Sequence, residues 1–254
     1  MKWRLPIKRE IKFFLALMVL LVLIAFAERE QHETMVKQIG ITIENFEENH
    51  FIDEQDVRKL MQFKDENLIG ATYGSINLKE IEAKIKQDKF IEDAELYSDL
   101  KGNLLVKVEL RRPIARIVRN DAPDAYIGED GVIMPVSEKY TARVPLISGA
   151  FTRQLLSMKN LSEHEEGKKI MELLAFIAED EFWEAQIAQL DMNAKGKITF
   201  YTQVGGEEVE FGYAENIENK FNKLMIYYKD ILPAKGWNTY KRVNLEYENQ
   251  IVAE

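Results

Sequence analysis

Hydrophobic and polar positions alternate over several short stretches of this chain, and these stretches predict strands. In the first stretch, Ile39, Ile41 and Ile43 alternate with polar or small residues, which is the pattern of a half-buried strand. Two further runs, 90–100 and 103–110, flank a turn at Gly102 and therefore predict a hairpin.

Between these strands the apolar residues are spaced as on one face of a helix. Residues 53–63 place apolar side chains on one face of a helix that Asp53 caps, and residues 77–90 do the same for a helix that Asn77 caps. The predicted order is β-α-α-β-β. Two helices packed on a three-stranded sheet form a small but sufficient core.

The pattern changes after Arg111 and Arg112, where Pro113 interrupts an apolar run. Proline has no N–H to donate and is confined to strand edges or strand beginnings, so we predict that one sheet ends here and a second domain begins. The two arginines are expected to be solvated or paired with acidic side chains.

The second domain reads as mixed β structure with two helices. A hairpin turn at Asp130-Gly131 is strongly indicated, and Ser162 is the expected cap of the first helix. The predicted elements are a hairpin over 126–137, a short buried strand within 143–151, a helix over 162–180, a meander over 186–213, a helix over 216–232 and a last strand over 243–254.

An uncharged apolar run, Phe13 to Ala27, lies near the amino terminus after a basic segment. It is just long enough to predict a transmembrane helix, and the positive charges before it place residues 1–12 in the cytoplasm. Two alternatives remain. The run Ala25-Phe26-Ala27 also fits the end of a cleavable signal peptide, and a buried core helix is a third interpretation. Both leading interpretations export the remainder of the chain.

Composition narrows the function classes. The chain has 254 residues, of which 46% are hydrophobic and 30% charged, an ordinary globular composition. It has no cysteine, which excludes disulfides and thiolate zinc sites. Five basic side chains and one acidic side chain give residues 1–12 a net charge of +4. Because the whole chain has a net charge of −9, the remaining residues carry −13. Such an acidic body argues against nucleic-acid binding.

No motif for catalysis is present in the sequence. The histidines are His32, His50 and His164, and none has a neighbouring nucleophile or the spacing of a metal site. We expect all three to be surface residues. The sequence therefore predicts a protein that is not an enzyme and that has no cofactor, no metal and no small-molecule substrate.

The whole pattern resembles the FtsQ/DivIB family of bacterial cell-division proteins, which have an amino-terminal anchor followed by a POTRA domain. The matching motifs are "FIDEQDVRKLM", "GSINLKEIEAKIKQDKFIEDAEL" and "VKVELRRPIARI". Glu109, Arg111, Arg112, Pro113 and Ala115 fit the junction at which that family enters its second domain. The chain departs from the family in "DLKGNL", where a proline is usual, and in "ENFEEN", where a glycine is common.

The resemblance implies an α+β chain with a single transmembrane helix, a POTRA domain and a mixed β-rich domain, and it favours retention of the anchor. The implied segments are a cytoplasmic tail over 1–12, the transmembrane helix over 13–27, the POTRA domain over 36–111 and the β-rich domain over 112–254.

The resemblance also implies a function. The family is a non-catalytic divisome scaffold of the plasma (inner) membrane, enriched at the septum, which links early and late division proteins and recruits single-pass partners of the FtsB and FtsL type. It uses its last strand for this purpose. Tyr247 matches the tyrosine of that strand, and Glu248, Asn249 and Gln250 continue it.

Other interpretations remain open. POTRA domains also occur in envelope transport and assembly factors, and cleavage after Ala27 would leave a secreted envelope binding protein. The last strand is either an edge that accepts a partner strand or an ordinary strand packed against its sheet.

Overall fold

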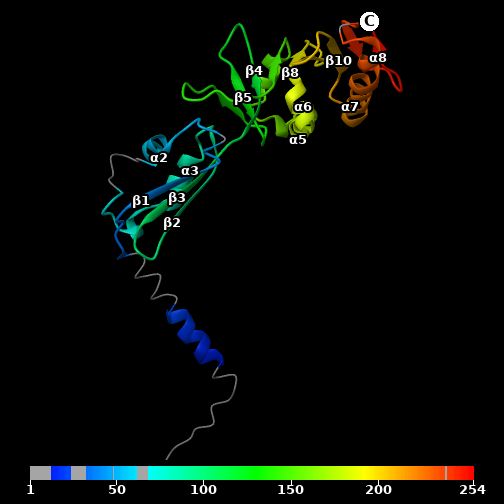
Figure 1. Cartoon of the computed structure of the whole chain (residues 1–254). Coiled ribbons are helices and arrows are strands. Elements are labelled where there is room, and N and C mark those ends of the chain that lie inside the picture. Colours follow the sequence, from blue (N-terminus) through cyan, green and yellow to red (C-terminus); the bar gives the residue numbers. More distant parts are fainter. Residues whose placement is uncertain (1–12, 24–32, 48, 62–67, 238) are drawn as a thin grey trace, which may run out of the picture. The chain divides into compact units, whose positions relative to one another are not determined.

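The computed structural model of the chain forms two compact units (Figure 1). The first unit comprises Met1–Glu44, Asp53–Asp88 and Asp93–Glu109, and the second comprises Asn45–Ile52, Lys89–Glu92 and Leu110–Glu254. The structure describes residues 13–23, 33–47, 49–61, 68–237 and 239–254.

The predicted membrane segment is only partly described. Residues 13–23 are helical, whereas residues 24–27 and the predicted cytoplasmic tail, 1–12, lie outside the described residues. Within the described residues, no helix has both the length and the hydrophobicity needed to cross a membrane. The membrane anchor therefore stays a prediction.

The first unit has the predicted order β-α-α-β-β, with one short 3₁₀ turn, η1, between the helices. Its sheet has the order β1-β3-β2, and β1 runs parallel to β3 (Figure 1). The elements are β1 (Ile39–Glu44), α2 (Glu54–Met61), η1 (Tyr73–Ser75), α3 (Leu78–Ile85), β2 (Ile91–Ser98) and β3 (Leu104–Leu110).

Local sequence explains where both helices of this unit begin. The Asp53 carboxylate accepts hydrogen bonds from the amides of Gln55 and Asp56, at 2.9 and 3.1 Å, and thereby satisfies donors that the first helical turn leaves open. The Asn77 side chain accepts from the Glu80 amide at 3.3 Å. Both predicted caps are confirmed.

The turn between β2 and β3 is organised by one carboxylate. Asp99 accepts hydrogen bonds from the amides of Lys101 and Asn103, each at 2.8 Å, and a third from the Asn103 side chain. Gly102 supplies the positive φ, +85°, that the turn requires.

This geometry gives a pH-dependent prediction. The hydrogen bonds from Asn103 and Lys101 lower the pKa of Asp99 below 3.8, so its contribution to folding is present above that value and is lost as the pH falls through the lowered pKa. A carboxyl-carbon NMR titration should place the Asp99 midpoint below 3.8. A midpoint at or above 3.8 would contradict the turn geometry.

The second unit is built on one mixed sheet with the order β12-β11-β10-β9-β8-β7-β4-β5-β6. Its strands are β4 (Pro113–Ile117), β5 (Ala125–Gly128), β6 (Ile133–Pro135), β7 (Leu146–Ser148), β8 (Ile187–Met192), β9 (Ile198–Thr202), β10 (Glu208–Gly212), β11 (Arg242–Asn244) and β12 (Val252–Ala253). Its helical segments are α4 (Thr152–Ser157), η2 (Leu161–Glu163), α5 (Glu165–Glu179), α6 (Glu181–Gln186), α7 (Ile217–Ile226), the π-helical η3 (Tyr227–Ile231) and α8 (Leu232–Lys235).

Several expectations for this unit are confirmed. Pro113 is the first residue of β4, and β8, β9 and β10 form the predicted antiparallel meander. The turn between β5 and β6 contains Gly131 at φ +85°. The two predicted helices correspond to α5 and to α7 with its continuation.

The predicted cap of the first of these helices is wrong. Ser162 lies in η2, where its amide donates to the Asn160 side chain at 2.9 Å, and α5 begins only after His164. The Ser162 hydroxyl donates instead to the carbonyl of Asp130 at 3.1 Å. A tertiary contact thus replaces the local cap. The prediction of two helices also missed the shorter helices α4, α6 and α8, which are too short to show a clear period.

The core of this unit joins its longer helices to the sheet. Phe176 of α5 stacks on Phe221 of α7, with ring centroids 4.7 Å apart. Phe221 also contacts Phe200 of β9 and Phe211 of β10, with centroids 5.8 and 5.4 Å away. Burying each such ring stabilises the fold by about 1.5–3 kcal/mol.

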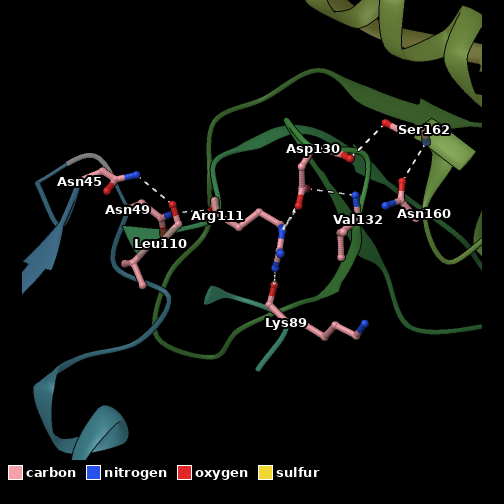
Figure 2. A network of polar contacts seen from close by, with 9 residues as sticks. All are labelled: Asn45, Asn49, Lys89, Leu110, Arg111, Asp130, Val132, Asn160 and Ser162. Carbon is pink, nitrogen blue, oxygen red and sulfur yellow. Dashed lines mark hydrogen bonds and ion pairs between the residues drawn. The ribbon is translucent and has the colours of Figure 1, made fainter. Parts of the chain in front are cut away.

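A buried arginine, Arg111, bonds to several separate stretches of the second unit (Figure 2). The Arg111 guanidinium donates through Nε to both carboxylate oxygens of Asp130, at 3.0 and 2.9 Å, and through Nη1 to the carbonyl of Lys89. The Arg111 carbonyl accepts from the Asn49 side chain at 2.7 Å. Of the two expected states, solvated or paired, Arg111 is therefore paired. The Arg112 side chain lies at the surface.

Candidate functional site

The carboxyl-terminal segment 242–254, here called the edge hairpin, forms one end of the second unit's sheet. Strand β12 pairs antiparallel with β11, with Val243 opposite Ala253 and Asn244 opposite Val252. Within the part of the chain that the structure describes, no further strand pairs with β12. The last strand is therefore an edge strand.

The register of the edge hairpin shows which backbone groups face outward. Arg242 and Glu254 exchange both of their backbone hydrogen bonds, at 3.1 and 3.0 Å. The next opposed pair, Val243 and Ala253, must then be a non-hydrogen-bonded pair, because the two kinds of pair alternate along antiparallel strands. The N–H and C=O of Ala253 consequently point away from β11, toward the open side of the sheet.

The four predicted partner-binding residues lie together, but not in a strand. Tyr247, Glu248, Asn249 and Gln250 form the turn that connects β11 to β12, and all four are exposed. The prediction of one continuous strand over 243–254 is wrong. The structure has two short strands with this turn between them.

Local chemistry explains why the strand is interrupted. The Asn244 side chain accepts a hydrogen bond from the Glu246 amide at 2.8 Å, which bends the backbone directly after β11. Asn249 has a φ of +55°, in the left-handed region that asparagine tolerates better than most residues. Polar residues with local hydrogen-bonding capacity therefore overcome the alternating pattern.

The conformation of Asn249 leads to a direct prediction. Asn249→Ala should destabilise the edge hairpin by about 1 kcal/mol, because a Cβ-bearing residue without a local polar partner is strained at positive φ. Asn249→Gly should be tolerated. Amide hydrogen exchange of the Glu254 N–H, which donates to the Arg242 carbonyl, measures the effect. Equal protection in both variants would argue against the left-handed turn.

A buried lysine forms hydrogen bonds to the backbone at the start of this turn. Lys223 of α7 is only 9% exposed, and its ammonium donates to the carbonyls of Leu245 and Tyr247, at 2.6 and 2.8 Å. Burial lowers the pKa of Lys223, because a charged group loses hydration in the interior. The two carbonyls compensate for part of that loss.

A second buried lysine supports the neighbouring strand. Lys220 donates to the carbonyl of Tyr213 at 2.7 Å and lies 4.6 Å from the ring centroid of Phe211. Burial also lowers its pKa. On the outside, Lys197 pairs with Glu246 at 2.7 Å, and this hydrogen bond raises the lysine's pKa. Three lysines thus fix the base of the edge hairpin.

Sequence reasoning found the exposed residues of this site but missed Lys220 and Lys223. A signal was present for Lys220, because it falls on the apolar stripe of α7 beside Phe221 and Leu224. A charged residue on such a stripe indicates a buried partner. The contacts of Lys223 with Leu245 and Tyr247 join residues 22 and 24 positions apart, which no local pattern reveals.

The two described histidines, His50 and His164, do not build a second site. His50 and His164 are exposed, as expected, and His32 lies outside the described residues. His50 packs between the rings of Phe46 and Tyr140, at centroid distances of 4.7 and 5.5 Å. Among the described residues, no cluster of three or more His, Asp or Glu side chains is arranged to hold a metal ion.

Comparison with known families agrees with this architecture. Residues 112–254 match a family model described as FtsQ/DivIB, C-terminal related, which covers more than half of the chain. Residues 34–109 match a model described as POTRA-like domain. No curated protein matches the chain.

Proposed function

Because the chain belongs to the FtsQ/DivIB family, we propose that it is a divisome scaffold that recruits single-pass partners of the FtsB and FtsL type and links early and late division proteins. Family membership supports the broader role, that of a cell-division scaffold. The FtsQ/DivIB and POTRA-like families are generally non-enzymatic, which favours assembly over catalysis.

The observation that carries the proposal is the open side of β12. The outward N–H and C=O of Ala253 offer a donor and an acceptor to an added strand, and strand addition uses such main-chain groups for affinity. Edges of this kind are otherwise protected in native proteins. The proposed partner segment is therefore an extended backbone that pairs with β12.

The turn of the edge hairpin supplies side chains beside that open edge. Tyr247 is 51% exposed, and large aromatic side chains are frequent anchors at protein interfaces. We assign Tyr247, Glu248, Asn249 and Gln250 to contacts with partner side chains next to the paired backbone. Specificity would then come from the turn and affinity from β12.

The proposed organisation follows the sequence expectations. It has a cytoplasmic tail over 1–12, a transmembrane helix over 13–27, a POTRA domain over 36–111 and a β-rich domain over 112–254. The main body would lie outside the plasma (inner) membrane and be enriched at the septum. An anchor in the same membrane as its partners raises their effective concentration.

A proline at the edge tests the strand-addition step. Ala253→Pro removes an N–H that faces away from β11, so the pairing of Glu254 with Arg242 should persist. We expect capture of FtsB- or FtsL-type partners from host membranes to fall at least about tenfold, which corresponds to one or two lost hydrogen bonds. Glu163→Ala, an exposed change in η2, is the control.

Two outcomes of this experiment would contradict the strand-addition step. One is unchanged capture by Ala253→Pro. The other is loss of capture accompanied by fast exchange of the Glu254 amide, because that result would trace the effect to an unfolded edge hairpin.

Microscopy of the chain tagged at Met1 separates the proposed role from its alternatives. A band at mid-cell supports the divisome role and a retained anchor. Diffuse fluorescence with a free tag would indicate cleavage after Ala27 and a secreted binding protein. An even peripheral ring would keep the anchor but favour an envelope transport or assembly factor.

A further inference from the structure

The second unit contains a polar cleft of about 850 Å³ that is separate from the edge hairpin. It opens where β4 and β7 end, beside β8 and the start of α4. The side chains that matter for its chemistry are Arg119, Asp121, Ser148, Arg153, Gln189 and Asp191. The volume is within the range of ligand sites, about 300–1,000 Å³.

One side of the cleft carries excess positive charge. Arg119 contacts one oxygen of Asp121 through Nε and Nη2, at 2.8 and 2.7 Å, and Arg153 contacts the other oxygen at 2.9 Å. Hydrogen bonds from the two arginines lower the pKa of Asp121. Asp124 also lines the cleft, but its charge is balanced by Arg116, which donates to it at 3.0 and 2.7 Å. The Asp121 carboxylate, shared by two guanidinium groups, therefore leaves one positive charge, and several N–H donors, for an anion.

The other side of the cleft carries negative charge. The Ser148 hydroxyl accepts a hydrogen bond from the Gln189 side chain at 2.7 Å and donates to the Asp191 carboxylate at 2.6 Å. This relay fixes the orientation of the carboxylate. In the part of the chain that the structure describes, no ammonium or guanidinium group forms an ion pair with Asp191.

Strand β7 separates the two charged sides. Ser148 of β7 lies opposite Asp191 of β8, and the Val118 amide bonds to the Ile147 carbonyl on the other side of β7 at 2.9 Å. Since neighbouring strands lie about 4.8 Å apart, the chain that leads from β4 to Arg119 is about 10 Å from the backbone of β8 that carries Asp191. Arg153 is on α4. A ligand that bridges the two charged sides needs its own charges several ångströms apart.

The floor between the two sides is backbone. Gly149, which follows β7, has a φ of +94°, and a Cβ there would lie 2.3 Å from the carbonyl oxygen of Met192. A residue with a side chain is therefore excluded at this position, and the backbone of Gly149 lies directly against that of Met192.

We propose that this cleft binds a short peptide by its charged ends, with the ammonium against Asp191 and the carboxylate between Arg119 and Arg153. Two residues span about 7 Å, and the hydrogen bonds at either end close the remaining gap. This site goes beyond the proposed scaffold function and does not depend on it. The same chemistry is offered by a polypeptide segment that carries a basic and an acidic side chain.

Ligand-observed NMR of the full chain in mild detergent tests the site with the dipeptide Ala-Ala. We expect saturation transfer to Ala-Ala and at least tenfold weaker binding to Asp191→Asn and to Arg153→Gln, because each change removes a charge-assisted contact. Glu163→Gln and Lys195→Gln, exposed changes elsewhere on the second unit, are the charge-matched controls. Arg153 is 80% exposed, so its variant should remain folded.

Blocked ligands identify which charge meets which side of the cleft. N-acetyl-Ala-Ala should bind weakly and be insensitive to Asp191→Asn, whereas Ala-Ala amide should be insensitive to Arg153→Gln. Binding of acetyl-Lys-Ala-Asp-amide in place of Ala-Ala, with the same dependence on both residues, would support the site and assign its occupant to side chains of a polypeptide. Absence of binding by both ligands, or binding that neither variant weakens, would overturn the proposal.

Discussion

Arg111→Ala should lower the free energy of unfolding of the second unit by about 3 kcal/mol, because it breaks a largely buried ion pair on one side only. The Arg111 side chain is 9% exposed and bonds to both oxygens of Asp130 and to the Lys89 carbonyl (Figure 2). Its loss leaves the Lys89 carbonyl without this donor and the Asp130 carboxylate with the Val132 amide, at 3.2 Å, as its remaining donor. Urea unfolding followed by tryptophan fluorescence measures the change, because Trp183, 3% exposed, lies in the core of the same unit.

The neighbouring arginine gives a matched control. Arg112 is exposed, so Arg112→Ala should change the free energy of unfolding by no more than about 0.5 kcal/mol. The double variant Arg111→Met with Asp130→Asn should recover part of the stability, since replacing both partners costs less than stranding one. Equal effects of Arg111→Ala and Arg112→Ala would contradict the pairing seen in the second unit.

Arg111 also shows what the sequence can and cannot predict. Proline chemistry placed the end of one sheet and the start of another at Pro113, because the missing N–H acts locally. The sequence did not show whether Arg111 is solvated or paired with an acidic side chain, nor which acidic side chain that is. Asp130 is 19 residues away and is brought close by the turn between β5 and β6, which no local pattern specifies.

The helices of the first unit were predictable for a related reason. Asp53 and Asn77 cap helices through amides two or three residues away, so the whole interaction is contained in the local sequence. Ser162 carries the same local signal, but its hydroxyl bonds to Asp130 instead. This tertiary contact replaces the local cap that the sequence predicts.

The candidate site follows the same division. The sequence located Tyr247, Glu248, Asn249 and Gln250 together, and the alternating apolar residues around them predicted one strand. The left-handed Asn249 and the side-chain hydrogen bond of Asn244 interrupt that strand. The polar cleft was missed for another reason: Ser148 and Asp191 are 43 residues apart and meet only because β7 and β8 pair in parallel.

The second large effect is expected at the lysine beneath the edge hairpin. Lys223→Met keeps the length and the apolar stem of the side chain but removes the ammonium that bonds to the carbonyls of Leu245 and Tyr247. Hydrogen bonds to a charged group contribute about 1.5–3 kcal/mol each. Since the buried ammonium has also lost hydration, we expect a net local loss of about 2 kcal/mol.

Hydrogen exchange resolves this loss within the edge hairpin. A local loss of about 2 kcal/mol corresponds to about thirtyfold faster exchange of the Leu245 and Glu254 amides, which bond to Glu210 and Arg242. The amides of β8 and β9 should keep their protection, because these strands pair with each other and Phe200 is fully buried in the core. Lys229→Met, an exposed change in η3, should leave the edge hairpin unchanged.

Partner capture then connects this lysine to the proposed function. If β12 and its turn accept an added strand, a loosened edge hairpin must be ordered at the moment of binding, and that ordering reduces affinity. Capture of FtsB- or FtsL-type partners by Lys223→Met should therefore fall by about the same thirtyfold factor, with Lys229→Met at the wild-type level. Faster exchange with undiminished capture would mean that Lys223 stabilises the turn but that the partner binds elsewhere on the protein.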